Sequence, residues 1–308
     1  MGSGGAGKGG RPPGFPTAAT LSTERPSQAV LVAFTGFVLI GGVNFVGVRY
    51  SNQELPPLLG AGLRFGLAAL VLAVVMGLTR TALPRGRALA GCVIYGTLGF
   101  GAGYGFAYTA LTELPAGAGA VVFASYPLFT VFLAAAHRLE RFRTRGLVGA
   151  LLAVIGIVIL ANPGSDRQLP LIPVLVMAAS AISAAESGVL IKKFPVVTPV
   201  AANSVAMATG AGILVVLSLL AGETWLLPDA ASTIWWVVYL AVVGSAGLFG
   251  LFLFVLHRWT ATATSYATAL LPVSAMVAGA LIRGEPLTIN GLVGAVLVTA
   301  AVYIGALS

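Results

Sequence analysis

The chain has 308 residues, of which 58% are hydrophobic and 8% are charged, and its mean hydropathy is +0.98. Because ordinary globular domains carry about 25% charged residues, this composition excludes a soluble protein. The net charge of +8 does not indicate a nucleic-acid partner, since the basic residues lie in short gaps between apolar runs, where they act as topology signals. The runs are about 20 residues long, the length of a membrane-spanning helix, and lack the alternation of a membrane barrel.

The chain begins with a segment that is not expected to fold. Residues 1–28 are rich in Gly, Pro, Ser and Thr, and we predict a disordered tail. After it, the sequence predicts an all-α membrane protein with ten transmembrane helices. The predicted spans are 29–49, 57–79, 88–110, 115–136, 146–161, 170–191, 199–220, 233–256, 261–282 and 288–307.

The chain contains an internal duplication. The segment 140–150, ERFRTRGLVGA, recurs at 285–295 as EPLTINGLVGA, an offset of 145 residues. The same offset aligns Pro127 with Pro272 and Gly99 with Gly244. We therefore predict two five-helix repeats, 29–161 and 170–307.

The basic residues predict the orientation. Of the 17 Lys and Arg residues, thirteen lie on the side of the N-terminus, three lie on the other side, and Arg64 lies inside a span. Because cytoplasmic loops carry the excess of Lys and Arg, both termini are predicted to be cytoplasmic in the plasma or inner membrane. Five spans are an odd number, so the two repeats should be inserted upside down relative to each other.

Several segments resemble the drug/metabolite transporter superfamily with two EamA-type domains. They are Gly42–Val46, Leu63–Phe65, Tyr126–Phe129, Glu140 with Gly146–Ala150, Leu271–Pro272, Glu285–Leu287 and Gly291–Ala295. The resemblance covers residues 30–307 and implies a transporter, with export the implied direction. The chain departs from the family pattern at Gly41, where tryptophan is common, and at Glu186.

Two prolines are predicted to mark the substrate site. Pro127 and Pro272 are expected near the middles of the fourth and ninth spans, where proline removes a backbone hydrogen bond and frees a carbonyl. Interrupted helices at matching positions of two repeats point to a site near the bilayer midplane. The alternative is that both are packing kinks.

The third span contains glycines and two tyrosines. Gly99 with Gly103, and Gly101 with Gly105, form small-residue faces that should let neighbouring helices approach closely. Tyr104 and Tyr108 lie one turn apart and could face a cavity. His137 and His257, outside this span, are expected to anchor helix ends at the interface.

Glu186 lies inside the sixth span, about one and a half turns from Lys192. A carboxylate at this depth should face a cavity or a partner. It could carry a coupling proton, bind a substrate amine, or pair with Lys192 or Lys193. All three readings remain open at the level of sequence.

Arg64 lies two turns into the second span, at a depth similar to that of Asn44. A buried guanidinium needs a partner, and a carbonyl or Asn44 could supply it. Arg64 could brace the fold or bind a substrate carboxylate. The full set of candidate cavity residues is Asn44, Arg64, Tyr104, Tyr108, Tyr126, Pro127, Glu186, Tyr266 and Pro272.

The sequence thus predicts a multi-pass secondary transporter for a small organic metabolite, such as an amino acid or amine, that works by alternating access with proton coupling. Alternatives are an uncoupled facilitator or exchanger and a non-transport scaffold. No cluster of catalytic or metal-ligating residue types occurs in the sequence, so no enzyme, cofactor or metal is predicted. The expected partners are the solute, protons, the lipid bilayer and a second copy of the chain in a homodimer.

Overall fold

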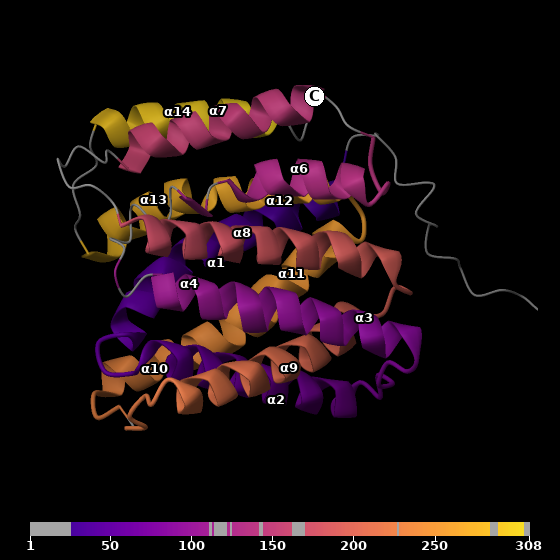
Figure 1. Cartoon of the computed structure of the whole chain (residues 1–308), viewed down its shortest axis with the longest axis vertical. Coiled ribbons are helices and arrows are strands. Elements are labelled where there is room, and N and C mark those ends of the chain that lie inside the picture. Colours follow the sequence, from indigo (N-terminus) through magenta and orange to yellow (C-terminus); the bar gives the residue numbers. More distant parts are fainter. Residues whose placement is uncertain are drawn as a thin grey trace, which may run out of the picture.

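The protein is a bundle of helices packed side by side, as a computed structural model shows (Figure 1). The structure describes residues 26–110, 113, 122–123, 125–141, 144–161, 170–226, 228–283 and 289–304. The predicted disordered tail lies largely outside this part, as does Glu285. The described residues contain helices and no strands, so the predicted all-α class is confirmed.

The described helices lie within or close to the predicted spans, although much of the first half of the span predicted at 115–136 lies outside the described residues and three other spans are divided into shorter elements. They are α1 (Gln28–Ser51), α2 (Pro57–Leu78), α3 (Arg87–Tyr95), α4 (Tyr104–Ala110), α6 (Tyr126–Ala136), α7 (Thr144–Ala161), α8 (Leu171–Leu190), α9 (Pro199–Leu220), α10 (Ala231–Ala241), α11 (Leu248–Leu256), α12 (Ala261–Ala269), α13 (Leu271–Arg283) and α14 (Ile289–Val302). A π-helix, η2 (Gly96–Gly103), joins α3 to α4, a second, η4 (Val242–Gly247), joins α10 to α11, and a short 3₁₀ turn, η3 (Ile191–Lys193), extends α8.

Six helical segments in the described part are long and apolar enough to cross a bilayer. They are Pro57–Leu78, Arg87–Ala110, Leu171–Lys193, Pro199–Leu220, Ala231–Leu256 and Ala261–Ile282. Many large apolar side chains on their outer faces are exposed, as expected for helices that contact lipid. The chain is therefore a multi-pass membrane protein.

Local sequence determines where several helices begin. The side chains of Ser27, Thr198 and Thr260 accept hydrogen bonds from backbone N–H groups in the first turns of α1, α9 and α12. Pro57 and Pro199 occupy the first turns of α2 and α9, where a missing N–H costs nothing. These caps satisfy backbone groups that water would otherwise have to reach.

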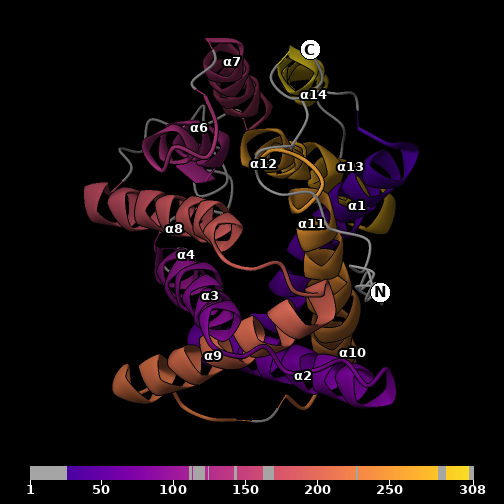
Figure 2. The same ribbon diagram turned by 90° about the vertical axis from the view of Figure 1, so that its right-hand side faces the viewer.

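The packing of one half of the chain mirrors that of the other. Helix α1 contacts α10, α11 and α13, and α8 contacts the matching elements of the first half, α3, η2, α4 and α6. Helices α2 and α9 pack together at one end of the bundle, and α7 and α14 pack together at the other (Figure 2).

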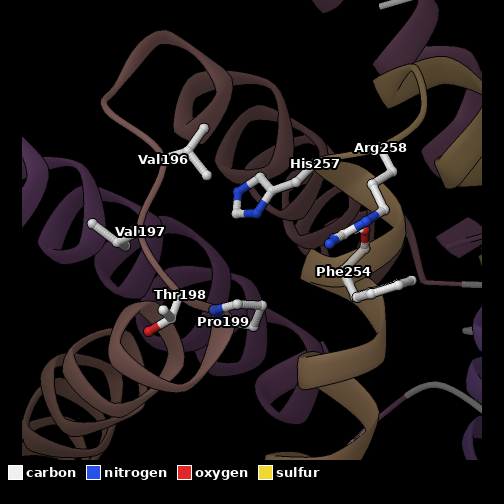
Figure 3. Close-up of a pocket in the computed structure, with 7 residues that line it drawn as sticks. All are labelled: Val196, Val197, Thr198, Pro199, Phe254, His257 and Arg258. Carbon is white, nitrogen blue, oxygen red and sulfur yellow. Dashed lines mark hydrogen bonds between the residues drawn. The ribbon is translucent and has the colours of Figure 1, made fainter. Parts of the chain in front are cut away.

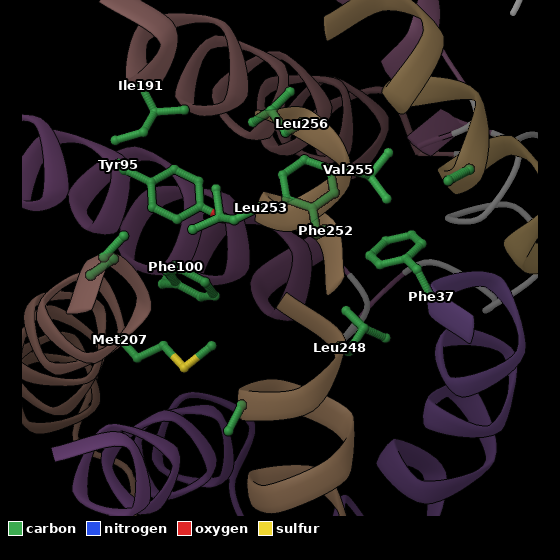
Figure 4. Close-up of a cluster of buried hydrophobic side chains, with 14 of the residues drawn as sticks. Phe37, Tyr95, Phe100, Ile191, Met207, Leu248, Phe252, Leu253, Val255 and Leu256 are labelled. Carbon is green, nitrogen blue, oxygen red and sulfur yellow. The ribbon is translucent and has the colours of Figure 1, made fainter. Parts of the chain in front are cut away.

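The apolar core lies where the two halves meet. Figure 4 shows Phe37, Tyr95, Phe100, Met207 and Phe252 pointing into one cluster from α1, α3, η2, α9 and α11. Aromatic rings continue this cluster, with the centroids of Phe65 and Phe100 4.9 Å apart and those of Phe100 and Phe249 4.7 Å apart. These contacts hold the π-helical segments in the centre of the bundle.

The glycine faces predicted for the third span are confirmed. A Cβ atom added at Gly99 would lie 3.0 Å from Ser187 Oγ of α8, and one at Gly103 would lie 3.9 Å from Ala184 Cβ of the same helix. A Cβ atom added at Gly101 would lie 2.9 Å from Ile213 Cδ1 of α9, and one added at Gly105 would lie 3.5 Å from Leu217 Cδ1 of the same helix. Gly99 and Gly103 therefore allow α8 to approach closely, and Gly101 and Gly105 allow α9 to do so.

Candidate functional site

Polar groups meet at the π-helix η4. The side-chain amide of Asn44, on α1, donates a hydrogen bond of 2.8 Å to the carbonyl of Gly244. Arg64, on α2, donates to the same carbonyl through Nη2 at 2.8 Å and to Ser245 Oγ through Nε at 2.6 Å. A π-helix disrupts the regular hydrogen-bond pattern of the backbone. Here, side chains of the first half donate hydrogen bonds to the Gly244 carbonyl of η4. The expectation that Arg64 finds a carbonyl near Asn44 is confirmed.

The absence of a side chain at Gly244 permits this contact. A Cβ atom at this position would overlap Asn44 Oδ1. Asn44 itself is 8% exposed, and its Oδ1 has no hydrogen-bond partner among the described residues. A buried acceptor without a partner is uncommon and calls for an explanation.

Aromatic rings surround the guanidinium of Arg64. Its Cζ lies 5.2 Å from the ring centroid of Phe65 and 5.7 Å from that of Tyr104. Tyr104 and Tyr108 are adjacent on one face, as predicted, with ring centroids 6.2 Å apart. Tyr104 also packs edge-on against Phe65 at 4.6 Å. Asn44, Arg64, Tyr104 and Tyr108 thus belong to one cluster, which we call the η4 cluster together with Gly244 and Ser245.

The equivalent π-helix η2 is served by neutral side chains. On α8, Ser183 Oγ donates to the carbonyl of Leu98 at 2.9 Å, and Ser180 Oγ donates to that of Gly103 at 2.8 Å. Sequence reasoning missed these serines, although their spacing of three residues on one helix face was a usable signal. In both halves, side chains thus donate hydrogen bonds to π-helix carbonyls. The donors at η4 include a cation, Arg64, whereas those at η2 are neutral serines.

A single turn residue, Ser125 or Leu270, interrupts the regular helix before each proline, and both turn residues keep αR backbone angles. Helix α6 begins at Tyr126 and α13 begins at Leu271, so Pro127 and Pro272 each occupy the second position of a helix. The breaks match in detail. Ser125 N donates to Val122 O and Leu270 N donates to Ala267 O, in both cases three residues back.

The tyrosines near these breaks are buried. Tyr126 stacks on Phe123, with ring centroids 5.8 Å apart. Tyr266 is fully buried, and its hydroxyl donates to the carbonyl of Gly146 on α7 at 2.5 Å. Tyr266 thus joins α12 of the second half to the Gly-Leu-Val-Gly-Ala segment of the first half.

Glu186 lies apart from the η4 cluster, at the end of the bundle where α6 and α8 terminate. Its Oε1 is 2.6 Å from His137 Nε2, and Lys193 Nζ is 2.7 Å from His137 Nδ1. A link between Glu186 and a lysine, one of the three alternatives for this residue, thus runs through His137, which contacts Glu186 in addition to lying at a helix end. The second oxygen of Glu186 is buried without a partner among the described residues.

A second carboxylate joins the two halves at the same end. Glu140, which follows α6, accepts hydrogen bonds from the backbone N–H groups of Ala261 and Thr262 at the start of α12. Lys192 Nζ donates to the carbonyl of Trp259 at 2.6 Å. A negative charge at a helix N-terminus is favourable, so the duplicated glutamate has a physical role in the first repeat.

Glu140→Ala is expected to lower the free energy of unfolding by about 2 kcal/mol, because both first-turn N–H groups of α12 would lose a charged acceptor. Unfolding of the purified protein in detergent would measure this. Glu54→Ala is the matched control, since among the described residues Glu54 accepts a single exposed hydrogen bond, from Ala230 N at 3.3 Å. Equal losses in both variants would contradict the role of Glu140.

One cavity of about 340 Å³ opens near this end of the bundle, lined by Val196, Val197, Thr198, Pro199, Phe254, His257 and Arg258 (Figure 3). Burial next to Lys192 and Arg258 lowers the pKa of His257 to about 4, so this imidazole is neutral near pH 7. A second cavity of about 360 Å³ lies between α1 and α13 and is lined almost entirely by apolar side chains. None of the predicted site residues lines either cavity.

The described residues hold no group of three or more His, Cys, Asp or Glu side chains that could bind a metal ion. What they present is a bundle of long apolar helices with paired breaks, paired π-helices and a few buried polar clusters. This combination is typical of membrane transporters, in which irregular backbone at membrane depth is buried in protein or lines a solute path.

The comparison with protein families agrees. Residues 28–162 and 171–306 each match the EamA-like transporter family, and the chain belongs to that family. The protein is therefore a membrane transporter of the EamA type, in the drug/metabolite transporter superfamily. The two matched segments correspond closely to the predicted repeats.

Curated relatives cover most of the chain. An uncharacterized inner membrane transporter, YedA of Escherichia coli K12, is 31% identical over 276 residues, 88% of each chain. A probable amino-acid metabolite efflux pump of Salmonella typhimurium is 29% identical over 279 residues, 87% of this chain and 91% of that one. One solved crystal structure, 20% identical, superposes with a TM-score of 0.76 over 92% of this chain and 97% of that one, which shows a shared fold.

Proposed function

We propose that this protein is a secondary transporter that exports a small organic metabolite, such as an amino acid or amine, by alternating access between two inverted five-helix halves. The observation that carries the proposal is the pair of helix breaks at Pro127 and Pro272, which have the same hydrogen-bond pattern at an offset of 145 residues. Broken helices at matching positions are typical of transporters that rock two repeats around a central site.

The mirrored packing of the two halves supports the same proposal. If the halves are inverted copies, the contacts of α1 with α10, α11 and α13 should recur as contacts of α8 with α3, α4 and α6, as they do. The ten-helix count, the 29–161 and 170–307 boundaries and the cytoplasmic termini remain predictions from the spacing of apolar runs and the distribution of Lys and Arg.

Glu186 is the proposed carrier of the coupling proton. It is the carboxylate that lies within a described apolar helix, and its free oxygen is buried. Its contact with His137 joins α6 of the first half to α8 of the second. A change in protonation there would make or break a bond between the halves, which is what coupling of a proton to alternating access requires. The same bond also fits a fixed link in an uncoupled exchanger.

Glu186→Gln is expected to abolish uptake driven by a pH gradient in proteoliposomes, because glutamine keeps the shape and cannot titrate. Exchange of labelled for unlabelled solute without a gradient should continue, since exchange moves no net proton. Loss of both activities would favour binding of a substrate amine by Glu186. Normal gradient-driven uptake in this variant would contradict the role of Glu186 in coupling, and Glu113→Gln, at an exposed position, serves as the control.

A further inference from the structure

The guanidinium of Arg64 is a buried cation, and its hydrogen-bond partners among the described residues are neutral. Arg64 is 3% exposed, and it donates hydrogen bonds to the Gly244 carbonyl and the Ser245 hydroxyl. Among the described residues, no carboxylate forms an ion pair with it. A guanidinium stays protonated in proteins, so within the described part of the bundle this charge has no counterion.

Such a charge is costly in a membrane protein. Ionised groups at membrane depth normally pair with an opposite charge, or face a cavity or solute path. Binding the carbonyls of a π-helix does not require a cation, because in η2 the carbonyls of Leu98 and Gly103 accept hydrogen bonds from Ser183 and Ser180. The positive charge at η4 therefore indicates a role beyond binding backbone carbonyls, which neutral serines fulfil at η2.

The side-chain oxygen of Asn44, which has no hydrogen-bond partner among the described residues, lies near the guanidinium of Arg64. Asn44 Nδ2 and Arg64 Nη2 each lie 2.8 Å from the same Gly244 oxygen, so the two side chains are neighbours. Because Nδ2 is the donor to that carbonyl, Oδ1 must be the orphan atom, and it has no partner among the described residues. A cationic donor and a neutral acceptor thus lie side by side.

The surroundings of the pair are aromatic. Phe65 and Tyr104 lie within 5.7 Å of the guanidinium, and Phe249 packs against both rings. A low-dielectric wall strengthens any charge-assisted hydrogen bond made there.

We propose that Arg64 and Asn44 bind the polar end of the substrate: the guanidinium takes a carboxylate, and Asn44 Oδ1 accepts a hydrogen bond from a neighbouring amino or hydroxyl group. The inference rests on the proposed transport function and narrows the substrate to a carboxylate-bearing metabolite. A carboxylate supplies the missing counterion, and a donor next to it satisfies the orphan oxygen. A simple amine satisfies Asn44 and leaves Arg64 unpaired.

The test compares ligands that differ only in the carboxylate. The purified wild-type protein is screened for thermal stabilisation by the twenty proteinogenic amino acids, and each one that binds is then compared with its amide and its decarboxylated amine. A bound ligand stabilises by mass action, so the midpoint shift reports affinity. We expect the acid to bind at least about tenfold more tightly than the amide, as loss of a charged hydrogen bond requires.

Arg64→Gln tests whether this preference depends on the guanidinium. The acid should lose at least about tenfold in affinity, whereas the amide should change little, so that the preference disappears. Ser183→Ala is the matched control, since it removes a side-chain hydrogen bond to a carbonyl of the other π-helix without removing a charge. It should lower stability and leave the ratio of acid to amide affinity unchanged.

Equal losses for acid and amide in Arg64→Gln would overturn the proposal and make Arg64 a brace. If that variant does not fold, the wild-type comparison still decides, because equal binding of acid and amide, or binding of no amino acid at all, overturns it. Transport of a simple amine in either case would leave the proposed transport function standing. Absence of any solute flux would instead contradict that function.

Discussion

Replacing Gly210 by alanine is expected to lower the free energy of unfolding by about 2–3 kcal/mol, because the added methyl group would overlap Phe100 Cβ and press on the backbone of η2. Backbone cannot yield as the end of a flexible side chain can, so α9 and η2 would have to separate. Thermal unfolding of the purified protein in detergent would measure the loss.

Gly212, on the same helix, provides the control. A Cβ atom at this position has no neighbour within 4 Å, and alanine is the better helix former by about 1 kcal/mol. Gly212→Ala should therefore leave stability unchanged or raise it. If the two variants melt at the same temperature, close packing of η2 against α9 is not what Gly210 provides.

The double variant Pro127→Ala and Pro272→Ala is expected to reduce solute flux by at least about tenfold while the protein remains folded. Alanine restores the N–H that proline lacks, so the segments on either side of Ser125 and of Leu270 could form one continuous helix. The irregular backbone that the proposed site depends on would then be lost. Initial rates of exchange in proteoliposomes would measure the effect.

Pro57→Ala is the matched control for this experiment, since Pro57 also occupies the first turn of a helix but follows a loop rather than a break. It should keep normal flux. Unchanged flux in the double variant would reduce Pro127 and Pro272 to packing features and remove the main support for a site at the breaks.

The sequence alone predicted much of the architecture, because membrane insertion imposes a local rule. Each span must be apolar over about 20 residues, so the runs of residues mark the helices directly. The offset of 145 residues located the duplicated prolines and glycines, and the spacing of Gly99, Gly101, Gly103 and Gly105 predicted two packing faces. The EamA-like family matches each half of the chain separately, in agreement with the duplication that this offset indicates.

The tertiary structure decided which polar groups meet. The Gly244 carbonyl accepts hydrogen bonds from Asn44 and Arg64, which lie 200 and 180 residues away in the sequence. Glu186 pairs with His137, which lies 49 residues away. These partners depend on how each helix is rotated about its axis and on where η2 and η4 break the regular turn. Hydropathy determines neither the rotation of a helix nor the position of a π-helix, since it shows only that a segment is apolar. The irregular turns at Ser125 and Leu270, next to Pro127 and Pro272, were decided in the same way, because sequence alone does not say how far a proline in an apolar run disturbs the helix around it.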